Sequence, residues 1–139
     1  MAHWLMKSEP GSYSWDDLVR DGGTKWDGVR NNAARLHLRA MRQGDTAFFY
    51  HSGADRAVVG IMEITGPGEP DGPSLPDGKG GAWVKVPVAP VKPLASPVTL
   101  AGIKAEFALA KIELVRQSRL SVAPVRDEEW ARILEMAGE

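Results

Sequence analysis

The sequence predicts an α+β fold, in which a small and mostly antiparallel sheet or barrel is flanked by helices. Strand-like segments cluster along the chain, and helix-like segments lie between and after them. There is no regular β-α-β alternation of the kind that a Rossmann fold requires. The 139 residues suffice for one domain with a core of useful size, so we expect a single domain over residues 1–139.

The chain begins with a strand and a short helix. Residues 3–9 contain an apolar block bounded by a Pro-Gly pair, which predicts a strand with a polar end. Ser14, followed three residues later by Asp17, resembles a capping box. We therefore expect a helix over residues 15–19 that closes near Gly22.

A second helix is expected over residues 31–41. Its apolar positions recur at spacings of four and three and form one buried stripe: Ala34, Leu38 and Met41. Arginines repeat the same spacing on another face: Arg35, Arg39 and Arg42. Such a stripe is either a solvated face or a surface that contacts phosphates, and the sequence leaves both interpretations open.

Two strands that form a hairpin are predicted next. Residues 46–52 are rich in aromatic side chains, and residues 57–64 are largely apolar and therefore mostly buried. Alternation divides the side chains of the first strand between two faces, with Phe48, Tyr50 and Ser52 on one and Phe49 and His51 on the other.

The second half of the chain is less regular. Residues 66–81 are dense in Gly, Pro and Asp, and we expect one long irregular loop there, a flap or rim. Residues 83–91 alternate like a strand, but Pro87 and Pro90 remove backbone donors, which predicts an edge or bulged strand. The other expected elements are a helical region over 99–110, a short strand over 120–125 and a final helix over 127–136, capped by Asp127, with Trp130, Ile133 and Leu134 inward.

Composition limits the class of protein. A formal net charge of -1 argues against binding nucleic acid by bulk electrostatics, although it permits a local basic groove. The chain has no cysteine, and its three histidines lack close ligand spacing, so we expect neither a metal nor a cofactor. No apolar run is long enough for a signal peptide or a membrane span, and we expect a soluble, cytoplasmic monomer without membrane contact.

The stretch Trp26-Asp27-Gly28-Val29-Arg30-Asn31 is the most informative one. Its carboxylate, guanidinium and amide together donate and accept hydrogen bonds, and can read the edge of a flat heterocycle beside an aromatic stacking face. A structural interpretation is equally open. In that interpretation the stretch is a loop entering a helix, with Asp27 or Asn31 as the cap and Trp26 in the core.

Four polar clusters are expected to converge, because strand ends in a small barrel lie close together. They are Lys7-Ser8-Glu9, the stretch 26–31, Tyr50-His51-Ser52 and residues 118–121. Each cluster also has a structural interpretation: a surface ion pair for Lys7 and Glu9, a core aromatic for Tyr50, a satisfied strand residue for His51, and turns for the serines.

Four blocks of the chain, in order, resemble the signature blocks of the EVE family. They are Trp4-Leu5-Met6-Lys7-Ser8-Glu9-Pro10, Trp26-Asp27-Gly28-Val29-Arg30-Asn31, Phe48-Phe49-Tyr50-His51-Ser52 and Arg119-Leu120-Ser121-Val122-x-Pro124. The resemblance covers essentially the whole chain and is loosest over residues 66–81 and 99–111. It implies a PUA-like pseudo-barrel, mostly antiparallel, with flanking helices.

The resemblance also implies a non-catalytic reader of modified bases in nucleic acid, with modified cytosine in DNA as the leading candidate. The base would be flipped out of the helix, because a chain without a strongly basic surface must gain selectivity from a pocket. The residues expected to form the base pocket are Lys7, Ser8, Trp26, Asp27, Val29, Asn31, Tyr50, Ser52 and Ser118. The residues expected to contact phosphate or nucleic acid are Arg30, Arg35, Arg39 and Arg119.

The rival hypothesis is a small ASCH-like hydrolase that acts on modified nucleosides. Lys7, Ser8 and Glu9 resemble a Lys–Glu–hydroxyl constellation, in which a lysine of lowered pKa acts as base or nucleophile. A protein-interaction module that uses the flap is a third interpretation, supported only by the composition of the loop.

Overall fold

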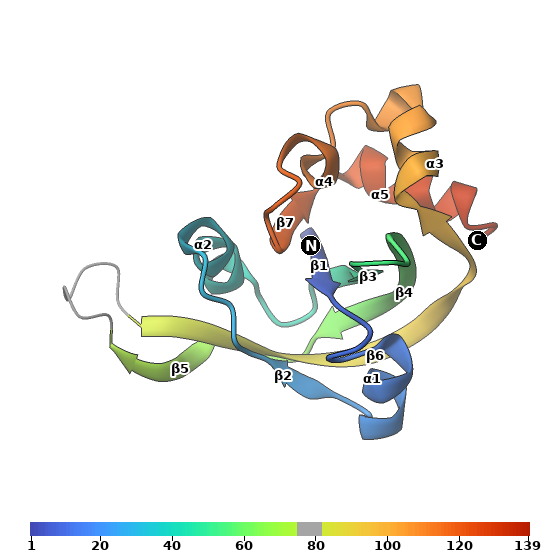
Figure 1. Ribbon diagram of the computed structural model, residues 1–139. Helices are drawn as coiled ribbons and strands as arrows, with labels where there is room; N and C mark the ends of the chain where they lie inside the picture. The colour runs from blue at the N-terminus through green and yellow to red at the C-terminus, as the bar shows by residue number, and fades with distance from the viewer. Residues whose placement is uncertain (75–81) are drawn as a thin grey trace.

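The computed structural model describes residues 1–74 and 82–139 (Figure 1). The strands are β1 (His3–Ser8), β2 (Thr24–Trp26), β3 (Thr46–His51), β4 (Ala57–Ile64), β5 (Glu69–Ser74), β6 (Ala82–Thr99) and β7 (Val122–Val125). The helices are α1 (Trp15–Asp21), α2 (Asn32–Ala40), α3 (Leu100–Ala105), the 3-10 helix η1 (Phe107–Leu109), α4 (Glu113–Arg116) and α5 (Asp127–Met136).

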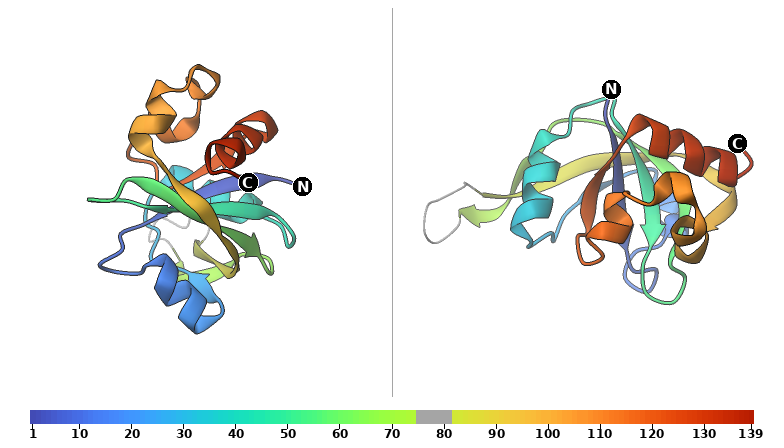
Figure 2. Two further views of the ribbon diagram at one scale, coloured as in Figure 1. Left: turned by 90° about the vertical axis from the view of Figure 1, so that its right-hand side faces the viewer. Right: turned by 90° about the horizontal axis from the view of Figure 1, so that it is seen from above.

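The strands form a mixed sheet in the order β2-β6-β4-β3-β1-β7, and β5 pairs with β6. The sheet curls into a half-barrel, with α1 on one side and α2 and the α3–α5 segment on the other (Figures 1 and 2). All strand pairs are antiparallel except β1 and β3, which run parallel. The predicted fold class, α+β with a mostly antiparallel pseudo-barrel and flanking helices, is confirmed.

The parallel pair is the feature that places the polar strand ends together. Its register sets Lys7 opposite Tyr50 and Ser8 opposite His51. Because parallel strands end at the same edge of a sheet, the carboxyl ends of β1 and β3 lie side by side. Both strands were predicted from the sequence, but their parallel pairing was not.

Two hydrophobic clusters share β3 through its alternation. Phe49 packs in one cluster with Trp15 and Trp26, whereas Phe48 and Tyr50 pack in the other with Trp130. The rings of Phe48 and Trp130 are stacked at 3.8 Å between centroids. The predicted division of β3 between two faces is confirmed for these residues.

One glycine is required by the close packing of α1 on the sheet. A Cβ added at Gly60 on β4 would lie 2.5 Å from the Trp15 ring, which is closer than real Cβ contacts. The absence of a side chain therefore lets the indole of Trp15 lie directly on the backbone of β4.

The predicted helix signals are borne out in the first half of the chain. Ser14 caps α1 in a capping box with Asp17, and Gly22 ends the helix in the left-handed region at φ 73°. In α2, the stripe of Ala34, Leu38 and Met41 is buried as predicted. The interpretation of the arginine stripe as a solvated face is wrong at Arg35, which is 7% exposed, whereas Arg39 and Arg42 are exposed.

Two predictions for the second half are wrong. Residues 66–81 are not one irregular loop, because residues 69–74 form β5; residues 75–81 lie outside the described range. The strand that follows is not an edge strand, because β6 lies between β2 and β4. The pairing of β6 with β4 shifts register twice, and one of the shifts lies next to Pro90, so the ladder is irregular where this proline lacks an N–H. Pro87 also lacks an N–H, but its carbonyl accepts from the Thr65 N–H at 3.0 Å. The bulged character of the strand was predicted.

The last helix is present, but Asp127 does not cap it. Asp127 is its first residue, and the carboxylate lies 3.4 Å from Nε2 of His3. The helix start is satisfied instead by Glu129, whose side chain accepts from the backbone N–H of Arg126 at 2.9 Å. Trp130 and Ile133 point inward as predicted, and Leu134 is partly buried.

A buried carboxylate fastens the amino terminus of β1 to the turn before β3. Asp45 is 5% exposed and accepts from the Trp4 indole at 3.0 Å, the Arg42 N–H at 3.0 Å and the Ala2 N–H at 3.1 Å. Burial alone would raise the pKa of Asp45, but the three hydrogen bonds outweigh it and lower the pKa below the ordinary 3.8.

We expect Asp45→Ala to lower the free energy of unfolding by about 2–4 kcal/mol, because buried donors lose a charged acceptor. Denaturant unfolding at neutral pH measures this loss. Since the folded-state pKa is depressed, the Asp45 contribution is fully present above the ordinary 3.8 and disappears as the pH falls below that value. The stability difference between the wild type and the variant should therefore become smaller in strong acid.

The control for this prediction is Glu63→Ala, which removes an exposed carboxylate from β4 opposite Thr46. It should change stability by less than about 0.5 kcal/mol. Equal stability of Asp45→Ala and Glu63→Ala at neutral pH would show that Asp45 does not hold this corner of the sheet.

Candidate functional site

A cavity of about 530 Å³ opens where the end of β1 meets β2 and the segment that follows β2. We call it the central cavity. Its lining residues are Lys7, Ser8, Ser12, Tyr13, Thr24, Lys25, Trp26, Asp27, Gly28, Val29, Arg30 and Ser121. Five of the nine residues predicted for the base pocket line it together: Lys7, Ser8, Trp26, Asp27 and Val29.

The remaining predicted pocket residues line two further hollows. The Tyr50 hollow, of about 330 Å³, is lined by Lys7, Tyr50, Ser52, Gly53, Arg56, Leu100, Lys104, Leu114 and Ser118. The Asn31 hollow, of about 390 Å³, is lined by Asn31, Ala33, Arg116, Gln117, Ser118, Arg119 and Leu120. Lys7 is shared by the central cavity and the Tyr50 hollow, and Ser118 by the two hollows. The structure thus distributes the predicted residues over three linked depressions.

The loop after β2 is held in shape by Asp71 of β5. Its carboxylate accepts from the Gly28 N–H at 2.9 Å and from Nη1 of Arg30 at 3.0 Å. The hydrogen bond from the Gly28 backbone and that from the Arg30 side chain lower the pKa of Asp71. Gly28 has φ 76°, a left-handed conformation that favours glycine, so the backbone can turn there to present its N–H.

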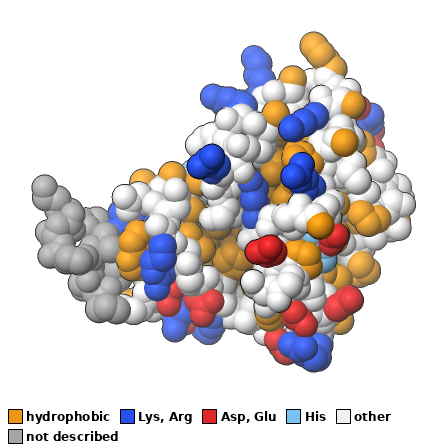
Figure 3. Space-filling view, viewed as in Figure 1, with side chains coloured by type: hydrophobic (Ala, Val, Ile, Leu, Met, Phe, Trp, Pro, Cys, Tyr) orange, Lys and Arg blue, Asp and Glu red, His pale blue; other side chains and the backbone are white. Residues whose placement is uncertain are grey.

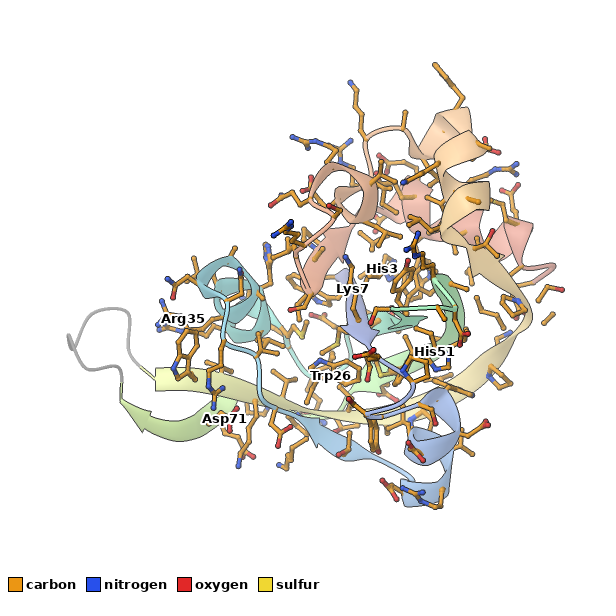
Figure 4. All side chains as sticks on the ribbon, in the orientation of Figure 1. His3, Lys7, Trp26, Arg35, His51 and Asp71 are labelled. Carbon is orange, nitrogen blue, oxygen red and sulfur yellow. The ribbon has the colours of Figure 1, made fainter. Side chains whose placement is uncertain are left out.

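Trp83 supports the same loop from β6. The guanidinium of Arg30 lies 5.4 Å from the centre of the Trp83 ring, and that of Arg35 lies 5.6 Å from it. Figure 4 shows Arg35 and Asp71 near the end of the sheet that carries β5. Neither Asp71 nor Trp83 was predicted to take part in the site, because each reaches the loop through strand pairing: Trp83 through the pairing of β6 with β2, and Asp71 through the pairing of β5 with β6.

The structural interpretation of the 26–31 stretch holds for two of its residues. Trp26 is 8% exposed and packs edge-on against Phe49, with 5.4 Å between ring centroids. Asn31 caps α2, and its Oδ1 accepts from the Ala34 N–H at 2.9 Å. Trp26 therefore forms a fixed wall of the central cavity, whereas Asn31 faces the neighbouring hollow.

Asp27 is exposed at the central cavity. Within residues 1–74 and 82–139, no hydrogen bond or ion pair engages its carboxylate. An acceptor without an intramolecular partner, beside an aromatic wall, is suited to receive an N–H group from a ligand.

Lys7 extends from β1 toward the segment between α4 and β7 (Figure 4). Its Nζ donates to the Ser118 carbonyl at 2.8 Å and lies 5.9 Å from the centre of the Tyr50 ring. Burial lowers the pKa of Lys7. Burial also raises the pKa of Tyr50, against the opposing charge of Arg56.

The other polar groups at the strand ends have internal partners. Ser8 donates its hydroxyl to the Tyr13 carbonyl at 2.6 Å. His51 contacts the Trp15 N–H through Nε2 at 3.0 Å and Asp55 through Nδ1 at 3.1 Å, in keeping with its interpretation as a satisfied strand residue. Glu9 is exposed and is not among the residues that line the three depressions.

The arginines predicted to contact nucleic acid lie in different places. Arg30 is half-exposed at the central cavity, and Arg119 is exposed at the Asn31 hollow. Arg39 lines a separate hollow between α2 and the β5–β6 pair, and Arg35 is buried beside Trp83. Figure 3 shows Lys and Arg side chains gathered around a depression on the face viewed.

The described ranges contain no candidate metal site and no candidate membrane-spanning helix. No group of three or more His, Cys, Asp or Glu side chains there is placed to hold a metal ion. No helix there is long and apolar enough to cross a membrane.

Comparison with known proteins identifies a family over almost the whole chain. Residues 2–136 match the EVE domain. Thymocyte nuclear protein 1 of Homo sapiens is 33% identical over 165 aligned residues, which cover 97% of this chain and 73% of the human protein.

Solved structures agree with this match. A Rhodopseudomonas palustris protein solved by NMR is 49% identical, with a TM-score of 0.89 over 99% of this chain and 94% of that one. Human thymocyte nuclear protein 1, solved in complex with DNA containing 5-methylcytosine, is 32% identical, with a TM-score of 0.91 over 100% of this chain and 99% of that one. An ASCH protein from Zymomonas mobilis, 11% identical with a TM-score of 0.59, shares the fold alone.

We expect Asp71→Ala to speed hydrogen exchange at the Gly28 amide by about tenfold or more, because that N–H loses its acceptor. Amide exchange followed by NMR measures this directly. Global stability should change little, since the pair with Arg30 is partly exposed.

Glu69→Gln is the matched control for this prediction. It breaks the neighbouring pair between β5 and β2, in which Glu69 lies 2.9 Å from Lys25, and leaves the acceptor of Gly28 in place. If both variants changed Gly28 exchange equally, Asp71 would not be the residue that orders the loop.

Proposed function

We propose that this chain, which belongs to the EVE domain family, reads modified cytosine in DNA by binding the flipped base in its central cavity. The cavity carries the proposal, because it brings three groups to one opening: the aromatic wall of Trp26, the guanidinium of Arg30 and the carboxylate of Asp27, which has no partner among the described residues. The likeness, over the whole of this chain, to a human protein solved with DNA containing 5-methylcytosine supports modified cytosine as the ligand.

A pocket is required because bulk charge cannot supply the affinity. The net charge is -1, so selectivity has to come from local contacts with the base. Extruding a base from a duplex costs a few kcal/mol. Stacking against an aromatic side chain contributes about 1–3 kcal/mol, and hydrogen bonds to the base edge add to it. Trp26 and Tyr13 are the aromatic residues of the cavity lining.

Three of the lining groups have chemistry that suits contact with a cytosine. The Asp27 carboxylate accepts from the exocyclic amine, which only an acceptor can recognise. The Arg30 fork supplies donors for the carbonyl and ring nitrogen of the same edge. Val29, buried and apolar, provides the surface that a 5-methyl group would contact.

The hydrolase alternative gains no specific support from the arrangement. Lys7 and Ser8 line the cavity but give their hydrogen bonds to the carbonyls of Ser118 and Tyr13, and Glu9 lies outside the lining. Turnover of an N4-acylated cytidine that is lost in Lys7→Ala would establish the hydrolase in place of the reader.

We expect the wild-type protein to bind a duplex with one central 5-methylcytosine more tightly than the unmodified duplex. Asp27→Ala should weaken binding to the methylated duplex by about tenfold, or about 1.4 kcal/mol, without changing the melting temperature. Fluorescence anisotropy measures the affinities, and thermal unfolding checks the fold.

Asp16→Ala is the matched control, since it also removes one exposed carboxylate, from α1, and changes the net charge equally. Affinities that are equal for Asp27→Ala and Asp16→Ala would exclude Asp27 from the contact with the base. Equal wild-type affinity for methylated and unmodified duplexes would contradict the proposed function itself.

A further inference from the structure

We infer that the Tyr50 hollow binds a phosphodiester of the DNA strand, next to the nucleotide whose base occupies the central cavity. The identity of the phosphate as a DNA phosphate rests on the proposed function. The charge, geometry and position of the hollow support the inference independently of one another.

The lining of the hollow is strongly basic. Among the described residues, the lining contains three cationic side chains, Lys7, Arg56 and Lys104, and no carboxylate. Within residues 1–74 and 82–139, none of the three forms an ion pair. Several other cations in the same ranges are each neutralised by a carboxylate: Arg20, Lys25, Arg30, Lys92, Arg116 and Arg132. The carboxylate of Glu9 lies near Gly53 at the rim of the hollow, but it is not within ion-pair distance of any of the three cations. Three cations around one hollow, none of them paired within the described residues, are suited to an anion.

Arg56, which lines the hollow, has an unusual backbone conformation that is fixed by hydrogen bonds. Arg56 has φ 45°, a left-handed conformation that is unfavourable for a residue with a Cβ. Its carbonyl accepts from the Leu100 N–H at 2.7 Å, which fastens the β3–β4 turn to the first residue of α3. Its Nε donates to the Gly53 carbonyl at 3.2 Å across the same turn.

The same attachment brings in the second cation. Lys104 lies four residues after Leu100 on α3, so both side chains occupy one face of the helix, and both line the hollow. Neutral donors complete the lining, because the side chains of Tyr50, Ser52 and Ser118 each carry a hydroxyl.

The position of the hollow suggests which phosphate it receives. Lys7 lines both the Tyr50 hollow and the central cavity, so it stands between them. A nucleotide with its base in the central cavity would direct its backbone past Lys7 into the basic lining. The Asn31 hollow is less suited to this role, because Arg116 there is paired with Glu113 at 2.8 Å, which leaves Arg119 as its one cation outside an ion pair among the described residues.

The test is a salt titration of the Arg56→Gln, Lys104→Gln double variant with the methylated duplex, from about 50 to about 200 mM salt. If the two side chains hold one phosphate, the slope of log affinity against log salt should become shallower by about 0.9, and affinity at the lowest salt should fall by about tenfold. The preference for methylated over unmodified duplex should persist, because phosphate contacts carry no sequence information.

The control is the double variant Arg42→Gln, Arg126→Gln. Arg42 lies shortly before Thr46 and Arg126 directly after Val125, and both Thr46 and Val125 pair with His3 at the start of β1. The variant therefore removes the same charge at the end of the strands that is opposite to Lys7. Both side chains are exposed, so the variant should fold normally and keep the wild-type slope.

Replacing single phosphates of the methylated strand by neutral methylphosphonates locates the contact. One internal replacement beside the modified base should weaken binding by the wild type but not by the Arg56→Gln, Lys104→Gln variant, as expected for an interacting pair in a double-mutant cycle. An effect confined to a terminal 5′-phosphate would overturn the assignment to an internal phosphodiester.

The outcomes separate the two proposals. An unchanged salt slope in the Arg56→Gln, Lys104→Gln variant, with the methyl preference intact, would overturn the phosphate site and leave the reader function standing. A shallower slope without any wild-type preference for the methylated duplex would support the phosphate site and overturn the reader function. Absence of binding to either duplex would overturn both.

Discussion

The parallel pairing of β1 with β3 is the constraint on which the rest of the site depends. It aligns Ser8 with His51 and so places the polar ends of both strands at one edge of the sheet. A parallel pair cannot be joined by a tight turn and needs a long crossover. In this chain the crossover contains α1, β2 and α2, and it carries the 26–31 stretch over the edge where the two strands end.

Packing and hydrogen bonding then hold that stretch in place. Trp26 packs against Phe49 in the core, and Asn31 starts α2, so both ends of the stretch are anchored. Between them, Asp71 holds Gly28 and Arg30. Under the proposed function these residues would serve both the fold and the site, because a rigid wall lowers the entropic cost of binding a flat ring.

Local patterns were sufficient to predict much of the fold. The capping box at Ser14, the glycine at the end of α1 and the alternation of β3 depend on neighbours in sequence, and each is found as predicted. The strand β5 and the central place of β6 could not be predicted in this way. Their segments are rich in proline and glycine, and their pairing depends on register shifts that arise only when distant strands meet.

In the candidate site, too, the residues in local sequence motifs were predicted, whereas those that depend on tertiary contacts were not. The polar blocks at the strand ends were predicted to converge, and the structure places them in three linked depressions. Asp71, Trp83, Arg56 and Lys104 were missed, because each belongs to a segment without a local motif and reaches the site through tertiary contacts.

A direct view of the bound base would test most closely whether the flipped base occupies the central cavity. The measurement is a search for nuclear Overhauser contacts between a ¹³C-labelled 5-methyl group of cytosine in a duplex and the protein. If the flipped base occupies the central cavity, the methyl group should contact Val29 and the Trp26 indole. Contacts to other protein residues alone, or retention of the contacts of a stacked base within the duplex, would contradict it.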